Sequence, residues 1–256
     1  MYIDTHAHLT DEAFKDRIQQ VVEDYRAAGV GLVINVGYDL KSSAESAYIA
    51  QKYDDIYFLA GLHPTDGEPA TPDNLAKISE LLKAEKCLGI GEIGLDYHWE
   101  CDRAAQKESF YAQLELAVDA GVPVSIHARD CAEEMLAALK IYAPKLPACV
   151  LHCYSLGAEC AKQFLKYGCT FAFGGAITFK NNKQIYEVAK VVPKDRLLTE
   201  TDCPYMAPVP HRGEVNEPKY VGLAAEKLAE IYGLASEEMQ EILYQNTRKT
   251  FGLRVK

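Results

Sequence analysis

Short apolar runs alternate with longer amphipathic segments along the whole chain. Runs rich in β-branched and aromatic residues predict eight strands, at Tyr2–His8, Gly31–Gly37, Ile56–His63, Cys87–Glu92, Val122–His127, Cys149–Tyr154, Cys169–Gly174 and Arg196–Asp202. Periodic segments predict helices at Asp11–Ala28, Ser42–Tyr53, Asp73–Glu85, Arg103–Ala120, Cys131–Tyr142, Ala158–Tyr167, Asn182–Val191 and, in two parts at the end, Pro218–Tyr232 and Ser236–Phe251. This regular alternation is typical of βα units around a parallel sheet.

Two α/β folds fit such an alternation. Eight βα units in ~250 residues favour a (β/α)8 TIM barrel, with a single domain over residues 1–256. An open, doubly wound sheet is the alternative, and it usually carries a Gly-rich phosphate loop after its first strand. That position holds His6-Ala7-His8. The barrel is therefore the favoured fold, and the C-terminal ends of its strands should meet on one face.

Composition narrows the class of protein. With 48% hydrophobic residues the 256-residue chain can bury one large core, and no run reaches the roughly 18 apolar residues of a membrane helix. The eight cysteines have irregular spacing, and Cys87, Cys149 and Cys169 lie in apolar runs, which predicts buried thiols of a reducing compartment. We expect a cytoplasmic monomer without a membrane partner. A net charge of −10 argues against a broad electrostatic footprint for nucleic acid.

Histidines and acids gather at the predicted C-terminal strand ends. Five of the seven histidines lie there, together with several acids and one arginine. Because alternate residues of a strand share a face, the pairs at i and i+2 should point the same way, and Leu198 should share a face with the last pair of acids. Buried carboxylates at a strand end are costly unless a cation or a proton compensates them. The residues are His6, His8, His63, Glu92, His127, Arg129, His152, Glu200 and Asp202.

This constellation predicts a metal centre. A single histidine at a strand end is more often a hydrogen-bonded core or surface residue, but four histidines, one Glu and one Asp at converging ends favour ligands. Six ligands exceed what one tetrahedral ion needs, so we predict two divalent ions. His6, His8 and Asp202 would hold one ion, His127 and His152 the other, and Glu92 would bridge them. Imidazole mixed with carboxylate suits zinc, manganese, iron or cobalt better than magnesium; Zn2+, Mn2+ and Mg2+ are kept as candidates.

Several motifs carry a resemblance to a known family. They are Asp4-Thr-His-Ala-His8, Gly61-Leu-His-Pro64, Gly89-Ile-Gly-Glu-Ile-Gly-Leu-Asp96, Ile126-His-Ala-Arg129, His152-Cys-Tyr154, Thr199-Glu-Thr-Asp-Cys-Pro-Tyr205 and the segment Pro208–Pro218. In this order, over essentially the whole chain, they resemble the TatD family of metal-dependent deoxyribonucleases. The resemblance implies a barrel of the metal-dependent hydrolase superfamily with a two-metal centre. It also implies hydrolysis of DNA phosphodiesters, often from the 3′ end. Related amidohydrolases often have a modified lysine on strand 4, where this chain has Glu92.

The resulting hypothesis is a two-metal phosphodiesterase that acts on DNA, preferably on single strands or ends. Asp202 would accept the proton of the attacking water, His63 and Arg129 would bind the scissile phosphate, and Glu200 would orient a ligand or water. Two alternatives stay open. One is a hydrolase on the same scaffold that acts on an amide, a lactone or another phosphoester. The other is a non-catalytic scaffold in which metal ions only close the barrel.

Other residues near the predicted barrel mouth have open roles. Arg129 could instead form a salt bridge with Asp130 or Glu133 at a helix start, and Asp96 could cap the loop backbone. The charged loop residues could line a groove or be solvated, and the aromatic residues could stack on bases or only pack. These are Lys180, His211 and Arg212, and Tyr97, Trp99 and Tyr154.

Overall fold

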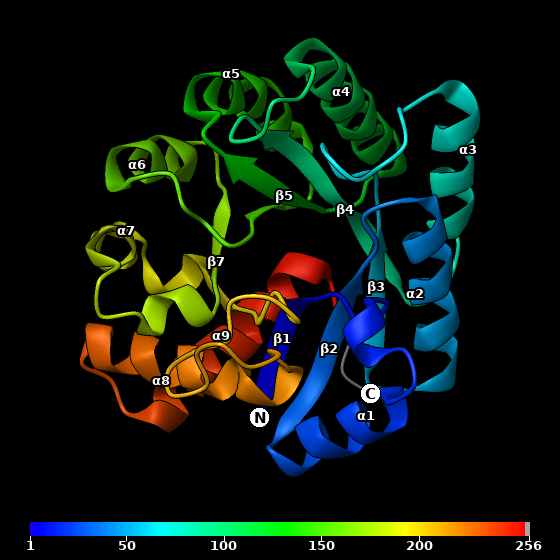
Figure 1. Cartoon of the computed structure of the whole chain (residues 1–256). Coiled ribbons are helices and arrows are strands. Elements are labelled where there is room, and N and C mark those ends of the chain that lie inside the picture. The colour runs from blue at the N-terminus through cyan, green and yellow to red at the C-terminus, as the bar shows by residue number, and fades with distance from the viewer. Residues whose placement is uncertain (254–256) are drawn as a thin grey trace.

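The protein forms a nearly closed barrel of eight parallel strands, as a computed structural model that describes residues 1–253 shows (Figure 1). The strands lie side by side in chain order. Their bounds are β1 Tyr2–Ala7, β2 Val30–Val36, β3 Ile56–Ala60, β4 Cys87–Asp96, β5 Val124–Arg129, β6 Cys149–Leu151, β7 Thr170–Phe173 and β8 Leu197–Thr199. The predicted (β/α)8 barrel is therefore confirmed.

The helices surround this barrel (Figure 1). The α-helices are α1 Ile18–Ala27, α2 Leu40–Lys52, α3 Pro72–Leu81, α4 Arg103–Ala120, α5 Ala132–Tyr142, α6 Ala158–Lys166, α7 Lys183–Val191, α8 Val221–Tyr232 and α9 Ser236–Phe251. Short 3-10 turns are η1 Glu12–Phe14, η2 Ala143–Lys145, η3 Gly175–Thr178, η4 Lys194–Arg196 and η5 Pro218–Tyr220. No helix among these residues is long and apolar enough to cross a membrane.

Local sequence signals set several helix ends. Asp39 accepts a hydrogen bond from the backbone of Ser42, whose hydroxyl in turn accepts one from the backbone N–H of Asp39, so α2 begins with a capping box. Thr71 caps α3 just before Pro72, whose fixed φ suits a first helical position. Gly121 ends α4 at a φ of 65°, a conformation that costs glycine little. Each of these βα units thus carries its own start or stop signal.

The seam between β1 and β8 is held mainly by loop and side-chain hydrogen bonds. The hydroxyl of Thr5 donates to the carbonyl oxygen of Thr199 at 3.0 Å. Beyond β8, the backbone N–H of Asp202 donates to the carbonyl oxygen of His6 at 2.9 Å. The carboxylate of Asp4 accepts from both the backbone and the hydroxyl of Thr201. The chain after β8 is therefore fixed against β1, although β8 itself is short.

A small apolar cluster combines inward-facing strand residues with one residue of the last helix. Ile34, Leu59 and Leu198 belong to it, and Phe251 at the end of α9 packs against them. Alternation along a strand sends these side chains inward, and branched side chains fill the interior of such barrels. Since α9 contacts β1 and β8, it also supports the seam.

Several expected boundaries differ from the structure; for example, the helix expected at Asp11–Ala28 is the turn η1 followed by α1 Ile18–Ala27. β4 continues past Glu92 to Asp96, with a register shift between Ile90 and Ile93. β8 ends at Thr199, and Asp202 has a left-handed φ of 57°. The expectation that strand alternation places Asp202 is therefore wrong, because the loop places it. Of the three cysteines expected to be buried, Cys87 is only partly buried, because it begins its strand.

Candidate metal centre

The six predicted ligands come together at the C-terminal end of the barrel. His6 lies on β1 and His8 directly after it, while Glu92 and His127 lie on β4 and β5. The last two, His152 and Asp202, follow β6 and β8. All but His127 are buried. Parallel strands thus bring residues nearly 200 positions apart in the chain into direct contact.

Glu92 occupies the middle of the group, and its two oxygens face different histidines. Its Oε2 lies 3.4 Å from the Nε2 atoms of both His6 and His8. Its Oε1 lies 2.6 Å from His152 Nε2 and 3.1 Å from His127 Nδ1. One carboxylate therefore joins two sets of imidazole nitrogens, which is the arrangement expected of a residue that bridges two ions.

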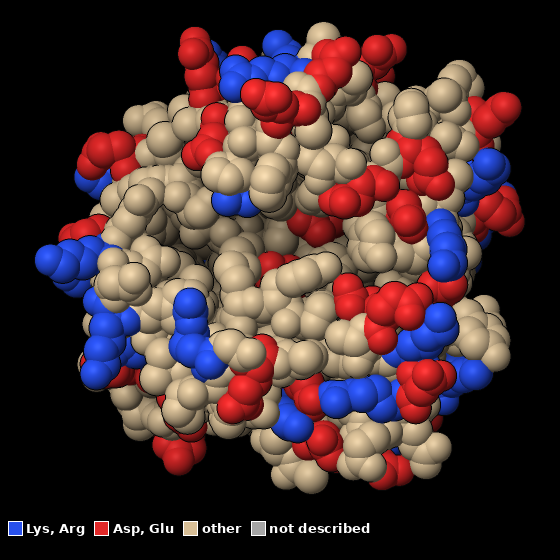
Figure 2. Space-filling view, viewed as in Figure 1, with Lys and Arg blue, Asp and Glu red and all other residues tan. Residues whose placement is uncertain are grey.

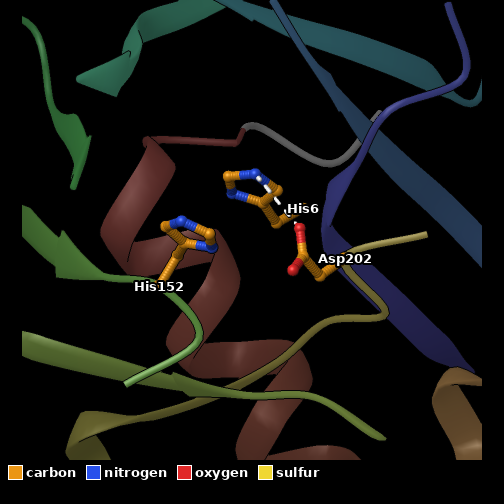
Figure 3. A group of neighbouring side chains, drawn as sticks. All are labelled: His6, His152 and Asp202. Atoms are coloured by element: carbon orange, nitrogen blue, oxygen red, sulfur yellow. Dashed lines mark ion pairs between the residues drawn. The ribbon is translucent and has the colours of Figure 1, made fainter. Parts of the chain in front are cut away.

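Asp202 closes the first set. Its Oδ1 lies 3.4 Å from His8 Nε2 and 4.0 Å from His6 Nε2. Figure 3 shows the Asp202 carboxylate directed at His6, with the His152 ring next to His6 and across from Asp202. The rings of His6 and His152 are stacked, with centroids 3.8 Å apart. His152 thus stands between the two sets and also falls in a ligand-type group with His6 and Asp202.

The outward nitrogens of these histidines have partners of their own. His8 Nδ1 lies 3.0 Å from the carbonyl oxygen of Val36, which can only accept, so the proton of His8 belongs on Nδ1. His6 Nδ1 lies 3.4 Å from the Ser125 hydroxyl. The two Nε2 atoms of His6 and His8 are 3.3 Å apart. Two nitrogen lone pairs at this distance repel each other unless a proton or a cation lies between them. The Nε2 atoms of His6 and His8 are therefore suited to bind a divalent ion.

The two ring nitrogens of His127 have the opposite arrangement to those of His8. His127 Nε2 lies 2.9 Å from Oδ2 of Asp96, and its Nδ1 faces Glu92. A carboxylate on Nε2 keeps a proton there, so a cation that displaces the other proton would meet the Nδ1 lone pair, which is directed at the centre.

His63 approaches the same oxygen of Glu92. Its Nε2 lies 3.5 Å from Glu92 Oε1, while its Nδ1 lies 2.8 Å from Oδ2 of Asp66. With Glu92 and His127 it forms a further ligand-type group, in which the ligand atoms all lie within 4.8 Å of one another. The predicted phosphate-binding histidine thus sits within reach of the second set.

The pKa values show how strongly the centre attracts positive charge. Burial opposes ionisation of Glu92, but the charge of His152 and the other histidines holds its pKa well below the usual range. Burial also disfavours charged His8, yet the hydrogen bond to Asp202 and the charge of Glu92 raise its pKa to about 9. His127 behaves likewise, through Asp96 and Glu92, with a pKa of about 9. Metal-free protein therefore holds protons where cations would bind.

Glu200 lies behind the centre. Its side chain is fully buried, its Oε1 accepts a hydrogen bond from the backbone N–H of Cys153, and its Oε2 has no hydrogen-bond partner among the described residues. His152 Nδ1 lies 3.8 Å from Oε1. Burial, together with the charge of Asp202, raises the pKa of Glu200 well above its usual value. Its position suits a residue that supports His152 rather than one that contacts substrate.

An open cavity of about 720 Å³ leads to the centre and is lined by His8, His63, Glu92, His127, His152 and Asp202. Arg129 and Trp99 line it too, with the guanidinium 5.9 Å from the centre of the Trp99 ring. Trp99 and Tyr205 are more than half exposed at this mouth. Figure 2 shows a hollow bordered mainly by uncharged residues, with acidic surface inside it and to one side. Within residues 1–253 no carboxylate forms an ion pair with Arg129, so the alternative pairing with Asp130 or Glu133 is not observed.

The remaining residues that the sequence offered as substrate contacts near the mouth lie outside the cavity. Tyr154 is buried, and its hydroxyl donates to the carbonyl oxygen of Gly157, so it packs. Tyr97 is buried beneath the Arg103 guanidinium. Arg212 lies over the Phe179 ring, His211 stacks on Tyr220, and Lys180 is exposed. None of these lines the cavity of the metal centre.

The expectation that Asp96 caps the loop backbone is confirmed, because its Oδ1 accepts from the backbone N–H of His98 at 2.9 Å. Sequence reasoning missed that Asp96 contacts His127 and that Asp66 contacts His63 from outside the centre. For Asp96 a signal was present: it ends the Gly89–Asp96 motif, and it lies at i+4 from Glu92, so an extended strand places both on one face. For Asp66 the only signal was its position in the loop after His63.

The fold and this centre define a class of protein, the barrel enzymes with a polar site built at the C-terminal ends of the strands. The chain matches the family model of TatD related DNases over residues 3–252. It is 40% identical over 252 residues to the uncharacterized metal-dependent hydrolase YabD of Bacillus subtilis, covering 98% of this chain and 99% of that protein. It is 30% identical to the 3'-5' ssDNA/RNA exonuclease TatD of Klebsiella pneumoniae, covering 98% of each. The crystal structure of the TatD homologue YJJV from Escherichia coli superposes with a TM-score of 0.92 at 27% identity, covering 99% of this chain and 98% of that one.

The chain therefore belongs to the TatD family of metal-dependent hydrolases. The resemblance that the motifs indicated is confirmed.

Proposed function

We propose that this hydrolase binds two divalent ions, Zn2+, Mn2+ or Mg2+, and cleaves DNA phosphodiester bonds from the 3′ end of single strands. The observation that carries the proposal is that the two carboxylate oxygens of Glu92 face separate sets of histidine nitrogens, at distances of 2.6–3.4 Å. His6, His8 and Asp202 would hold one ion, and His127 and His152 the other. Bound divalent ions would lower the pKa of water and neutralise charge on phosphate oxygens.

Supporting evidence for the substrate comes from the family. The matching model describes TatD related DNases, and a relative that is 30% identical is named a 3'-5' ssDNA/RNA exonuclease. The scarcity of basic residues at the mouth favours a short contact with a strand end over a long contact with duplex DNA.

Four side chains would contact the substrate or the attacking water, or hold a metal ligand in place. Asp202 reaches the cavity and keeps a lowered pKa through its hydrogen bond to His8 despite burial, so it is ionised and can accept a proton from the attacking water. His63 and Arg129 line the same cavity and can donate hydrogen bonds to phosphate oxygens. Glu200, 3.8 Å from His152 Nδ1, would keep His152 in place.

The test is hydrolysis of end-labelled oligonucleotides by metal-free protein reloaded with Zn2+, Mn2+ or Mg2+. We expect stepwise shortening from the 3′ end of single strands, and loss of it in Asp202→Asn. Asp195→Asn is the matched control, because its carboxylate is 68% exposed and lies at the opposite end of β8. Stepwise release from the 5′ end, or activity in Asp202→Asn within a few-fold of the parent, would contradict the proposal.

The alternatives make different predictions in parallel assays. A hydrolase for amides, lactones or other phosphoesters would turn over those substrates and leave oligonucleotides intact. A non-catalytic scaffold would gain melting temperature on metal binding without any turnover. The proposal also treats residues 1–256 as one domain of a monomeric, cytoplasmic protein, and light scattering of the purified chain tests the monomer.

A further inference from the structure

We propose that Asp96 is a positioning residue that selects which nitrogen of His127 binds metal. The inference rests on the two-ion part of the proposed function and adds a residue that its ligand set does not contain. Its basis is the way Asp96 and His127 contact each other on neighbouring strands β4 and β5.

The contact is close and buried. Asp96 is 2% exposed, and its Oδ2 lies 2.9 Å from His127 Nε2. On the other side of the ring, His127 Nδ1 lies 3.1 Å from Glu92 Oε1. An ionised carboxylate only accepts hydrogen bonds, so Nε2 keeps its proton towards Asp96 when a metal ion replaces the proton between Nδ1 and Glu92. The Nδ1 lone pair is then the ligand, in contrast to His8, whose Nδ1 faces a carbonyl oxygen.

The backbone of Asp96 is held independently of its carboxylate. Its N–H donates to Oε1 of Gln106, and its carbonyl oxygen accepts from Nε2 of Gln106, both at 2.9 Å. Gln106 is buried on α4. A change confined to the Asp96 side chain should therefore leave the end of β4 in place, so that its effect on His127 can be measured.

Both oxygens of the carboxylate are used. Oδ2 faces His127, while Oδ1 accepts a hydrogen bond from the backbone N–H of His98 at 2.9 Å. The side-chain amide of an Asp96→Asn variant has one acceptor oxygen for these two donors. If that oxygen kept the bond to His98, the NH2 group would face His127 Nε2 and favour the tautomer protonated on Nδ1. That tautomer cannot bind metal through Nδ1, so Asp96→Asn should impair metal binding.

The experiment titrates metal-free parent, Asp96→Asn and Asp96→Ala with Co2+, followed by calorimetry and by the visible absorption of the ion. We expect the second ion to bind ~10–100-fold more weakly in both variants, with the first ion unaffected. Asp130→Asn is the matched control. Asp130 forms a similar carboxylate–imidazole pair with His98 at 3.3 Å and is 64% exposed, so both ions should bind as in the parent.

A second measurement needs no variant. Long-range 1H–15N correlation on the Zn2+-loaded parent, labelled with 15N-histidine, should show His127 protonated on Nε2 and His8 on Nδ1. A His127 protonated on Nδ1, or second-ion affinity in Asp96→Asn and Asp96→Ala within about threefold of the parent, would overturn the inference. A parent that binds only one ion would instead refute the two-ion function itself and this inference with it.

Discussion

Loading the metal-free protein with divalent ions should release protons, and the number can be worked out from the centre. His8 and His127 both have a pKa of about 9 in the metal-free protein. A group with this pKa is about 90% protonated at pH 8 and about half protonated at pH 9. Because a histidine binds metal only after losing a proton, filling both sites should release nearly two protons at pH 8 and about one at pH 9.

The assay is calorimetric titration with Zn2+ in buffers of different ionisation enthalpy, at pH 8 and pH 9. The dependence of the observed heat on buffer enthalpy gives the number of protons released. NMR titration of the histidine ring protons in metal-free protein checks the two pKa values directly. Release of less than about half a proton at pH 8, or titration of both rings near pH 6.5, would refute the electrostatic account of the centre.

The same shifts set the pH dependence of stability in metal-free protein. His8 and His127 have raised pKa values, so their contribution is fully present below pH 6.5 and is lost as pH rises towards 9. His6 has the opposite shift, because burial and the charge of His152 lower its pKa to about 4. Its effect destabilises the fold as pH falls from 6.5 towards 4. Above pH 6.5 the raised pKa of Glu200 acts in the same direction as those of His8 and His127, so metal-free protein should melt at a lower temperature as pH rises from 6.5 towards 9. Thermal unfolding across a pH series checks this; a melting temperature that keeps rising to pH 9 would contradict the assigned shifts.

Three further predictions follow from single positions. Asp202→Asn should lower hydrolysis by more than the ~10–100-fold typical of a supporting group and leave the protein folded, as circular dichroism would show; near-parental turnover would contradict its role. Arg129→Ala should weaken oligonucleotide binding about equally for every sequence, on a shallow salt slope on the order of −0.7 per phosphate neutralised; a sequence-dependent loss would place the phosphate contact elsewhere. Gly94→Ala should lower the free energy of unfolding in urea by at least ~2 kcal/mol, because the added Cβ would lie 2.0 Å from the carbonyl oxygen of His127. Gly121→Ala is the control and should cost only ~1 kcal/mol, because Gly121 has a φ of 65° but no atom within 4 Å of the added Cβ. Equal losses in the two variants would show that the clash at Gly94 is relieved.

The periodicity of the chain was sufficient to predict the barrel. Strands and helices alternate with clear start and stop signals, and the right-handed connection of parallel strands leaves few other ways to bury eight apolar runs. The ligand-type residues were predictable for the same reason. His6, Glu92 and His127 each lie near the end of an apolar run, and a barrel brings such ends together.

What the sequence could not predict is which atoms face each other. The register shift within β4 and the left-handed backbone at Asp202 depend on the neighbouring strands and on the hydrogen bonds to β1. Neither has a periodic signal in the chain. The pairing of Asp96 with His127 follows from the register of β4 against β5, in which Gly94 lies opposite His127 and Asp96 opposite Arg129. Periodicity thus determines the face on which a side chain lies, whereas the partner of each nitrogen and oxygen is decided by contacts between residues far apart in the chain, which form only when the barrel closes.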